Sequence, residues 1–160
     1  MWQGAALLLL LLAANGAPVL AKRLLGNRWS SPIDGGRRLP DGRPLLGASK
    51  TWRGLVAGVV TAAAVAPLLG YSAVFGAVFG GASLAGDLIS SFIKRRLGIA
   101  SSGRATGLDQ IPEALLPLLY ARSALGLELV DLVLLTLVFL GGSLVLSRLA
   151  FRLGIREQPY

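Results

Sequence analysis

An aspartate lies inside a run of apolar residues, and three consecutive cations follow that run directly. Asp87 is part of the stretch Ser83–Ile93, and the cations are Lys94, Arg95 and Arg96. A charged side chain in the hydrocarbon region costs roughly 2.5–3.5 kcal/mol on insertion scales, so an acid there is a candidate functional residue. At the basic end of its span, Asp87 could hold a divalent cation where a lipid headgroup meets a charged, soluble substrate.

On a helix, Asp87 shares one face with Ser90, Ser91 and Lys94, because these residues are three, four and seven positions further on. A polar stripe that ends in cations is the pattern expected for one wall of a headgroup pocket. Two other interpretations stay open. Asp87 could form a structural pair with Lys94 or with a cation of the first loop, and the three cations could be a stop-transfer cluster.

Two further acids follow, after the flexible segment Ala100–Gly103. Asp109 and Glu113 are four residues apart, so they lie on one face if a helix has begun there. Asp109 could instead cap that helix, since Pro112 suits a first turn.

The first loop ends in Gly47-Ala48-Ser49-Lys50-Thr51-Trp52-Arg53-Gly54. Gly47 allows a close approach of the backbone to a phosphate, and Lys50 and Arg53 can neutralise one. The spacing is not that of a P-loop, and a basic collar that binds anionic lipid is the alternative. Asp34 and Asp41, earlier in the loop, are assigned to turns, although both could reach the same pocket.

The composition places these residues in a small membrane protein. The chain has 160 residues, of which 54% are hydrophobic and 15% charged, and its mean hydropathy is +0.66. It contains no Cys and no His, which excludes disulfides, thiolate or imidazole metal sites and Ser-His or Cys-His nucleophilic chemistry. Any metal must be a hard cation bound by oxygen, which indicates Mg²⁺. The net charge of +8 suits phosphate-bearing substrates or an anionic membrane face, and no nucleic acid is expected as a partner.

Five hydrophobic segments predict an all-α, polytopic membrane protein that forms a single domain over residues 1–160. Four of them are near the roughly 20 residues that cross a bilayer as a helix. The fourth is short and contains Pro112 and Pro117, so a tilted, kinked or re-entrant segment is expected. The predicted segments are Gly4–Leu20, Gly54–Leu69, Tyr71–Ile93, Leu108–Leu119 and Leu127–Leu146.

The cations predict the orientation of these segments. Of the sixteen Lys and Arg residues, all but Arg122 fall in the loops at about 21–53 and 94–107 or after the fifth segment. The positive-inside rule therefore places both loops and the C-terminus in the cytoplasm and the N-terminus outside. A cleaved signal peptide is disfavoured, because Met1-Trp2-Gln3 has no cation and the cations follow the apolar run.

In combination, these patterns resemble the CDP-archaeol synthases, small five-span relatives of the CDP-diacylglycerol synthases. The resemblance covers nearly the whole chain, in the order of the family. It rests on Ala14–Val19, Lys50–Gly54, Gly86-Asp87, Ser91–Gly98 and Asp109-Gln110.

The resemblance implies a Mg²⁺-dependent transfer of CMP from CTP to a membrane lipid phosphate, with release of pyrophosphate. The acceptor would be an archaeol-type ether lipid phosphate or phosphatidic acid. Asp87 and Asp109 would bind the metal and, with Lys94, form the catalytic set. The candidate phosphate-binding residues are Asn15, Lys50, Arg53, Arg95 and Arg96.

The chain departs from the family at one site residue. The family usually has a further acid three residues after Asp109, where this chain has Pro112. Glu113, one residue later, is therefore the candidate third metal ligand.

The expected location is the cell membrane, with the active site facing the cytoplasm. A non-catalytic small membrane protein, such as an assembly factor or an oligomeric subunit, is the alternative. Glycine-rich stretches such as Gly76–Gly81 and Gly141-Gly142 allow close helix packing, so a homodimer is also open.

Overall fold

The computed structural model describes residues 2–101, 103 and 105–154. Its elements are α1 (Trp2–Leu25), α2 (Trp52–Val65), the 3-10 turn η1 (Ala66–Leu69), α3 (Ala73–Arg96), α4 (Gln110–Leu125) and α5 (Leu129–Arg152). No strand occurs in the described ranges, and the predicted all-α class is confirmed.

Within the described residues, four segments are long and apolar enough to cross a membrane: Trp2–Leu25, Trp52–Leu69, Ala73–Arg96 and Leu129–Arg152. The fourth helix in the chain, α4, has 16 residues and is shorter than the roughly 20 that cross a bilayer. The short fourth segment is thus observed, although it begins and ends later than the predicted Leu108–Leu119.

Helix α3 includes the three cations that were expected to lie in the second loop. It continues to Arg96, and Gly98 then adopts the left-handed conformation (φ 76°) that often follows a helix end. Cations are favourable in a last helical turn, because they face the negative end of the helix dipole. Loop two is therefore residues 97–109. Two of the predicted cytoplasmic cations, Arg104 and Arg156, lie outside the described residues.

Local capping explains where several helices begin. The hydroxyls of Thr51 and Ser72 accept hydrogen bonds from the backbone N–H groups of Gly54 and Phe75. Glu128 and Asp131 form a capping box at the start of α5.

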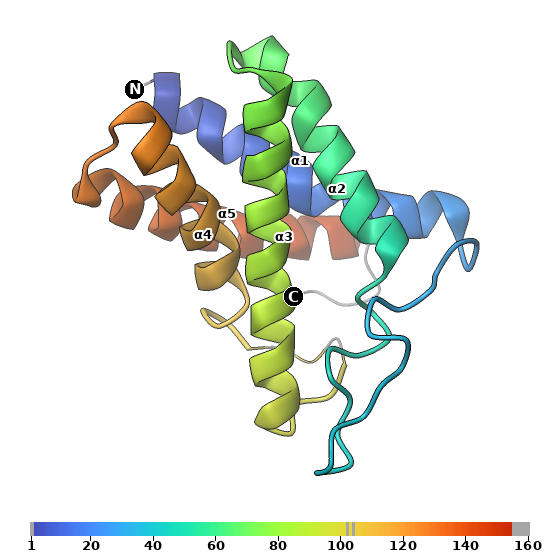
Figure 1. Cartoon of the computed structure of the whole chain (residues 1–160). Coiled ribbons are helices and arrows are strands. Elements are labelled where there is room, and N and C mark those ends of the chain that lie inside the picture. The colour runs from blue at the N-terminus through green and yellow to red at the C-terminus, as the bar shows by residue number, and fades with distance from the viewer. Residues whose placement is uncertain (1, 102, 104, 155–160) are drawn as a thin grey trace.

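Helix α3 is the central element of the bundle (Figure 1). It packs on α1, α2 and α4, whereas α5 packs on α4 and α1. Much of the core lies between α1, α3 and α4 and is apolar, with Leu7, Leu10, Leu11, Phe79 and Leu118 fully buried.

Loop one, residues 26–51, is a folded strap and not an open connection. Isolated antiparallel bridges join Pro32 to Thr51 and, inside that pair, Arg38 to Pro44, so the strap is one outgoing arm and one returning arm. Since α1 continues to Leu25, the loop starts later than the predicted residue 21.

Candidate active site

Lys50 and Asp87 form an ion pair between the end of loop one and the middle of α3. The Lys50 Nζ lies 2.7 Å from Oδ1 and 2.6 Å from Oδ2 of Asp87. Lys50 immediately precedes the cap of α2, and the packing of α2 on α3 brings it to the aspartate. Of the alternatives that the sequence left open for Asp87, the structure shows the pair with a cation of loop one.

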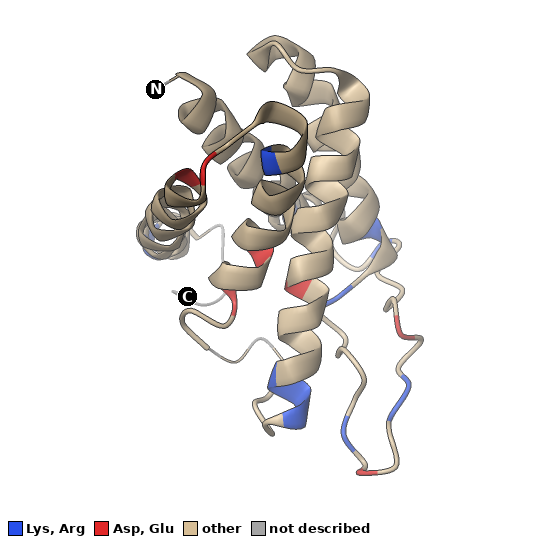
Figure 2. Ribbon diagram, turned by 60° about the vertical axis from the view of Figure 1, so that its left-hand side comes forward, with Lys and Arg blue, Asp and Glu red and all other residues tan. Residues whose placement is uncertain are grey.

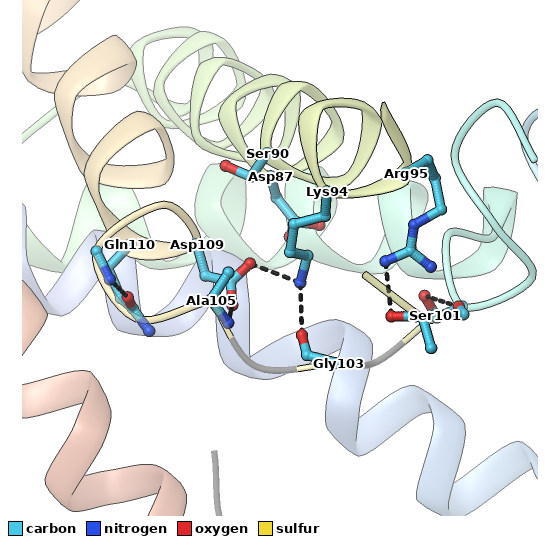
Figure 3. Close-up of polar contacts among 12 residues, drawn as sticks. Asp87, Ser90, Lys94, Arg95, Ser101, Gly103, Ala105, Asp109 and Gln110 are labelled. Atoms are coloured by element: carbon cyan, nitrogen blue, oxygen red, sulfur yellow. Dashed lines mark hydrogen bonds and ion pairs between the residues drawn. The ribbon is translucent and has the colours of Figure 1, made fainter. Parts of the chain in front are cut away.

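Lys94 and Asp109 form a second ion pair, between α3 and the end of loop two. The Lys94 Nζ lies 2.6 Å from Asp109 Oδ1 and donates a hydrogen bond to the Gly103 carbonyl at 3.0 Å. Figure 3 shows Lys94 reaching from the helix to both groups. The side chain of Lys94 is 10% exposed, so the ammonium is largely enclosed by its partners.

The alternative role of Asp109, as a side-chain cap of α4, is not observed. Asp109 occupies the cap position, but its side chain makes no capping hydrogen bond. Its Oδ2 instead accepts a hydrogen bond from the backbone N–H of Ala105, and its Oδ1 pairs with Lys94. The carboxylate therefore faces back toward loop two and α3.

Arg95 is a buried cation beside a cavity. Its side chain donates from Nη2 to the Ala100 carbonyl at 2.8 Å, and its buried Nε has no hydrogen-bond partner. The cavity, of about 510 Å³, lies between loop one and the start of loop two, a size typical of small-molecule sites. Its polar and charged lining residues are Asp34, Arg38, Arg43, Arg95 and Ser101.

Arg53 and Arg96, both predicted to bind phosphate, are not among the residues that line this cavity. Arg96 pairs with Asp41 at 2.5 Å and donates to the Pro44 carbonyl, so it holds the strap against the end of α3. Arg53 donates to the carbonyls of Gly26 and Arg28 at 2.8 and 2.6 Å. Both guanidinium groups are thus engaged by loop-one backbone, a role that the sequence could not separate from phosphate binding.

Asn15 lies inside the helix bundle. Its amide donates to the Leu11 carbonyl and to the Ser83 hydroxyl, and Ser83 in turn donates to the Glu113 carbonyl at 2.8 Å. These bonds connect α1, α3 and α4 one helical turn before Asp87. The structure thus places this amide in contacts between helices, and its binding of a phosphate stays a prediction.

The predicted three-acid metal set is not assembled. Within the part of the chain that the structure describes, no three Asp or Glu side chains gather as a possible metal site. Asp87 and Asp109 are each held by a lysine, and Glu113 is not grouped with them.

The Ser90 hydroxyl also turns away from the predicted pocket wall. It donates to the Gly86 carbonyl of its own helix at 2.9 Å.

Asp34 is the residue whose importance the sequence understated. It is 7% exposed, and its carboxylate accepts hydrogen bonds from the backbone N–H groups of Gly36, Leu46 and Gly47. Burial raises the pKa of this carboxyl, but the three amides outweigh it and hold the pKa below its ordinary value. The sequence assigned Asp34 to a turn, which agrees with its bond to Gly36, but it did not indicate the bonds to Leu46 and Gly47.

Charged residues gather mainly at one end of the bundle, where α3 ends and loop one folds back (Figure 2). The two lysine–carboxylate pairs, Arg95 and the cavity all belong to this end. Such an arrangement can bind several phosphates and exchange its internal ion pairs for new ones.

Comparison with known proteins identifies the group to which this site belongs. A family described as CarS-like, CDP-archaeol synthase, matches residues 6–160. The CDP-archaeol synthase of Hyperthermus butylicus is 45% identical over 109 residues, which cover 62% of this chain and 60% of the relative, so that match spans less than two thirds of it. The CDP-archaeol synthase of Thermococcus onnurineus is 34% identical over 164 residues, covering 92% of this chain and 89% of the relative.

A solved structure shares the fold. It is described as an intramembrane enzyme for archaeal membrane lipids biosynthesis. It superposes with a TM-score of 0.76 at 35% identity, covering 89% of this chain and 90% of the other.

Proposed function

Because this chain belongs to the CDP-archaeol synthase family, we propose that it transfers CMP from CTP to a membrane lipid phosphate. The products are a CDP-lipid and pyrophosphate, and the favoured acceptor is an archaeol-type ether lipid phosphate. The observation that carries the proposal is the pairing of Lys50 with Asp87 and of Lys94 with Asp109 at the basic end of the bundle.

The nucleotide is assigned to the cavity between loop one and loop two. CTP carries several negative charges, and Arg38, Arg43 and Arg95 line this cavity. The glycine at position 47 adds to the fit, because it leaves backbone rather than a side chain on the wall.

The lipid phosphate is assigned to the two lysine–carboxylate pairs beside α3. A phosphate monoester is already an adequate nucleophile for the α-phosphorus of CTP. Phosphoryl-type transfer depends mainly on in-line positioning and charge neutralisation, so the absence of His is no obstacle. Lys50 and Lys94 supply the mobile positive charge, since each can leave its carboxylate for a phosphate oxygen.

The donor chemistry of the site fits Mg²⁺. With no Cys or His in the chain, the available ligands are oxygens, which a hard cation prefers. Asp87 and Asp109 are the residues that would hold it, once their lysines have moved to phosphates. When bound, the ion neutralises charge on the phosphates of the nucleotide.

The site is proposed to face the cytoplasm from the cell membrane. The described cations lie mainly at this end of the bundle, as the positive-inside rule requires of a cytoplasmic face. CTP is also a cytoplasmic substrate, so the location and the chemistry agree.

The test is incorporation of label from CTP, radiolabelled at its α-phosphate, into extractable lipid by purified protein. The acceptors are an unsaturated ether-linked glycerol phosphate and phosphatidic acid, each with and without Mg²⁺. Label that needs Mg²⁺ and is lost in Asp87→Asn supports the proposal. Asp131→Asn, the same change at the start of α5, is the matched control and is expected to retain labelling.

Folded protein that labels neither lipid would contradict the proposal. Labelling of phosphatidic acid alone would keep the reaction and replace the proposed acceptor.

A further inference from the structure

The Asp34 carboxylate has a structural setting that the proposed chemistry does not use. Among the described acidic residues it is the one in the buried class, although it belongs to a loop at the edge of the bundle. A buried carboxylate is costly unless its oxygens are hydrogen-bonded. The hydrogen bonds of this carboxylate therefore hold part of loop one in place.

The carboxylate joins two distant parts of the strap. Its Oδ1 accepts from the Gly36 N–H at 2.9 Å, within the turn that Asp34 begins. Its Oδ2 accepts from the N–H groups of Leu46 and Gly47 at 2.8 and 3.1 Å, on the returning arm. The charge-assisted bonds fix the separation of the two arms.

Lys50 is held by both of these arms. Its backbone N–H donates to the Gly47 carbonyl at 3.2 Å, and its carbonyl accepts from the Ile33 N–H at 2.8 Å. Ile33 is the neighbour of Asp34, and Gly47 donates to the Asp34 carboxylate. One backbone hydrogen bond of Lys50 therefore ends at the residue before Asp34, and the other ends at a residue that is bonded to the Asp34 carboxylate.

The same contacts shape the wall of the cavity. Gly47 has a φ of 102°, a conformation that favours glycine. A Cβ there would lie 3.0 Å from the Ser101 hydroxyl and 3.5 Å from Nη1 of Arg95. A displacement of Gly47 would therefore disturb the position of the Arg95 side chain as well as that of Lys50.

We infer that Asp34 is a positioning residue for Lys50: it ties the two arms of loop one so that the ammonium reaches Asp87 and, in turnover, a substrate phosphate. We assign Asp34 no role as a metal ligand or in proton transfer, because its carboxylate oxygens accept hydrogen bonds from backbone N–H groups. The inference rests on the proposed function for the phosphate-binding part of this role, whereas the placement of Lys50 can be measured separately.

The test compares the acylation rates of the three lysines by mass spectrometry in wild type and in Asp34→Asn. Lys22, Lys50 and Lys94 are the lysines of the chain, so each variant contains its own reference sites. The asparagine side chain would place its NH2 group against a backbone N–H group, and two donors cannot bond to each other. At least one of the three hydrogen bonds to residue 34 would therefore be lost. Lys50 is expected to react several-fold faster, with Lys22 and Lys94 unchanged.

The same variant is expected to lose about 10- to 100-fold in kcat/KM for label transfer, since small displacements of a charged group are costly to catalysis. Asp41→Asn is the matched control. It makes the same change in the same loop, but Asp41 accepts one backbone bond, from Arg43, and pairs with Arg96. In Asp41→Asn, Lys50 is expected to react at the wild-type rate.

Unchanged Lys50 reactivity in Asp34→Asn would overturn the inference, as would an equal rise at Lys50 and Lys94, which indicates general loosening. Should Asp34→Asn not fold, Asp34→Glu, which keeps the charge but displaces the oxygens, must show the selective rise at Lys50. Lys50→Met separates the two proposals. Full activity in that variant would reject the proposed role of Lys50, while the acylation rates would still decide what Asp34 holds.

Discussion

The two lysine–carboxylate pairs are the residues on which the proposed chemistry depends. The Lys50 and Asp87 side chains are 22% and 28% exposed, so water still reaches both groups. Ion pairs that are partly hydrated contribute little net stability, because attraction and desolvation nearly cancel. Exchange of the carboxylate for a phosphate at Lys50 therefore costs little, which suits the proposed binding and release of charged substrates.

The pKa of Asp34 leads to a prediction about acid sensitivity. Because this pKa is lowered from its ordinary value of 3.8, the folded strap is stabilised above that value. The stabilisation is lost only as the pH falls through the still lower folded-state pKa. The backbone amides of Leu46 and Gly47 are therefore expected to keep their hydrogen-exchange protection from about pH 7 to about pH 5.

Exchange measured by mass spectrometry and corrected for its intrinsic pH dependence checks this expectation. Loss of protection at these two amides near pH 6 would contradict it, since Asp34 would then titrate above its ordinary range.

At the scale of elements, α3 does most of the positioning. Asp87 and Lys94 are seven residues apart, so two helical turns place both on one face, while Arg95 turns toward the cavity. The facing element, α4, must come close for Asp109 to meet Lys94. Gly86 permits that approach, because its α-carbon lies against the backbone of Pro112 and Glu113.

Gly86→Ala is accordingly expected to separate α3 from α4. The added Cβ would collide with the Pro112 carbonyl and lie 2.7 Å from the Glu113 nitrogen, and backbone cannot turn aside as a side chain can. Overpacking of this kind typically costs about 1–3 kcal/mol. Thermal unfolding in detergent should show the loss, together with reduced label transfer.

Gly81→Ala is the control on the same helix, because the nearest atom to its added Cβ is Val59 Cγ2 at 4.0 Å. It is expected to unfold at or above the wild-type temperature, since alanine favours helix over glycine. Equal stability of the two variants would show that α3 and α4 do not meet as described.

At the scale of the whole molecule, the orientation of the bundle in the membrane is open to a direct test. The chain contains no cysteine, so a single introduced thiol reports on one position. Pro40→Cys lies in loop one, and Ser123→Cys lies near the end of α4; both positions are exposed. A membrane-impermeant maleimide added outside intact cells should label Ser123→Cys and not Pro40→Cys.

Labelling of both variants after permeabilisation is the control for thiol reactivity. Labelling of Pro40→Cys in intact cells would place loop one outside and would contradict the cytoplasmic site.

Self-association remains a separate prediction. Gly141 and Gly142 on α5 have no neighbour within 4 Å of an added Cβ, so they do not serve packing within the described chain.

The sequence by itself determined the all-α class, the apolar segments and the gathering of cations near Asp87. These properties depend on hydropathy and charge along short stretches, which are local and survive in any arrangement of the helices. The family resemblance was also available from local motifs, such as Gly86-Asp87 and Asp109-Gln110.

The partner of each charged group was decided only by the tertiary structure. Lys50 meets Asp87 from 37 residues away, and Arg96 meets Asp41 from 55 away. Arg53 and Arg96 look like phosphate ligands in the sequence, yet both bind the backbone of loop one. Asp34 looks like an ordinary turn residue, but the fold of the strap brings two distant amides to it. Such contacts depend on how loops fold across helices, and spacing along the chain does not encode them.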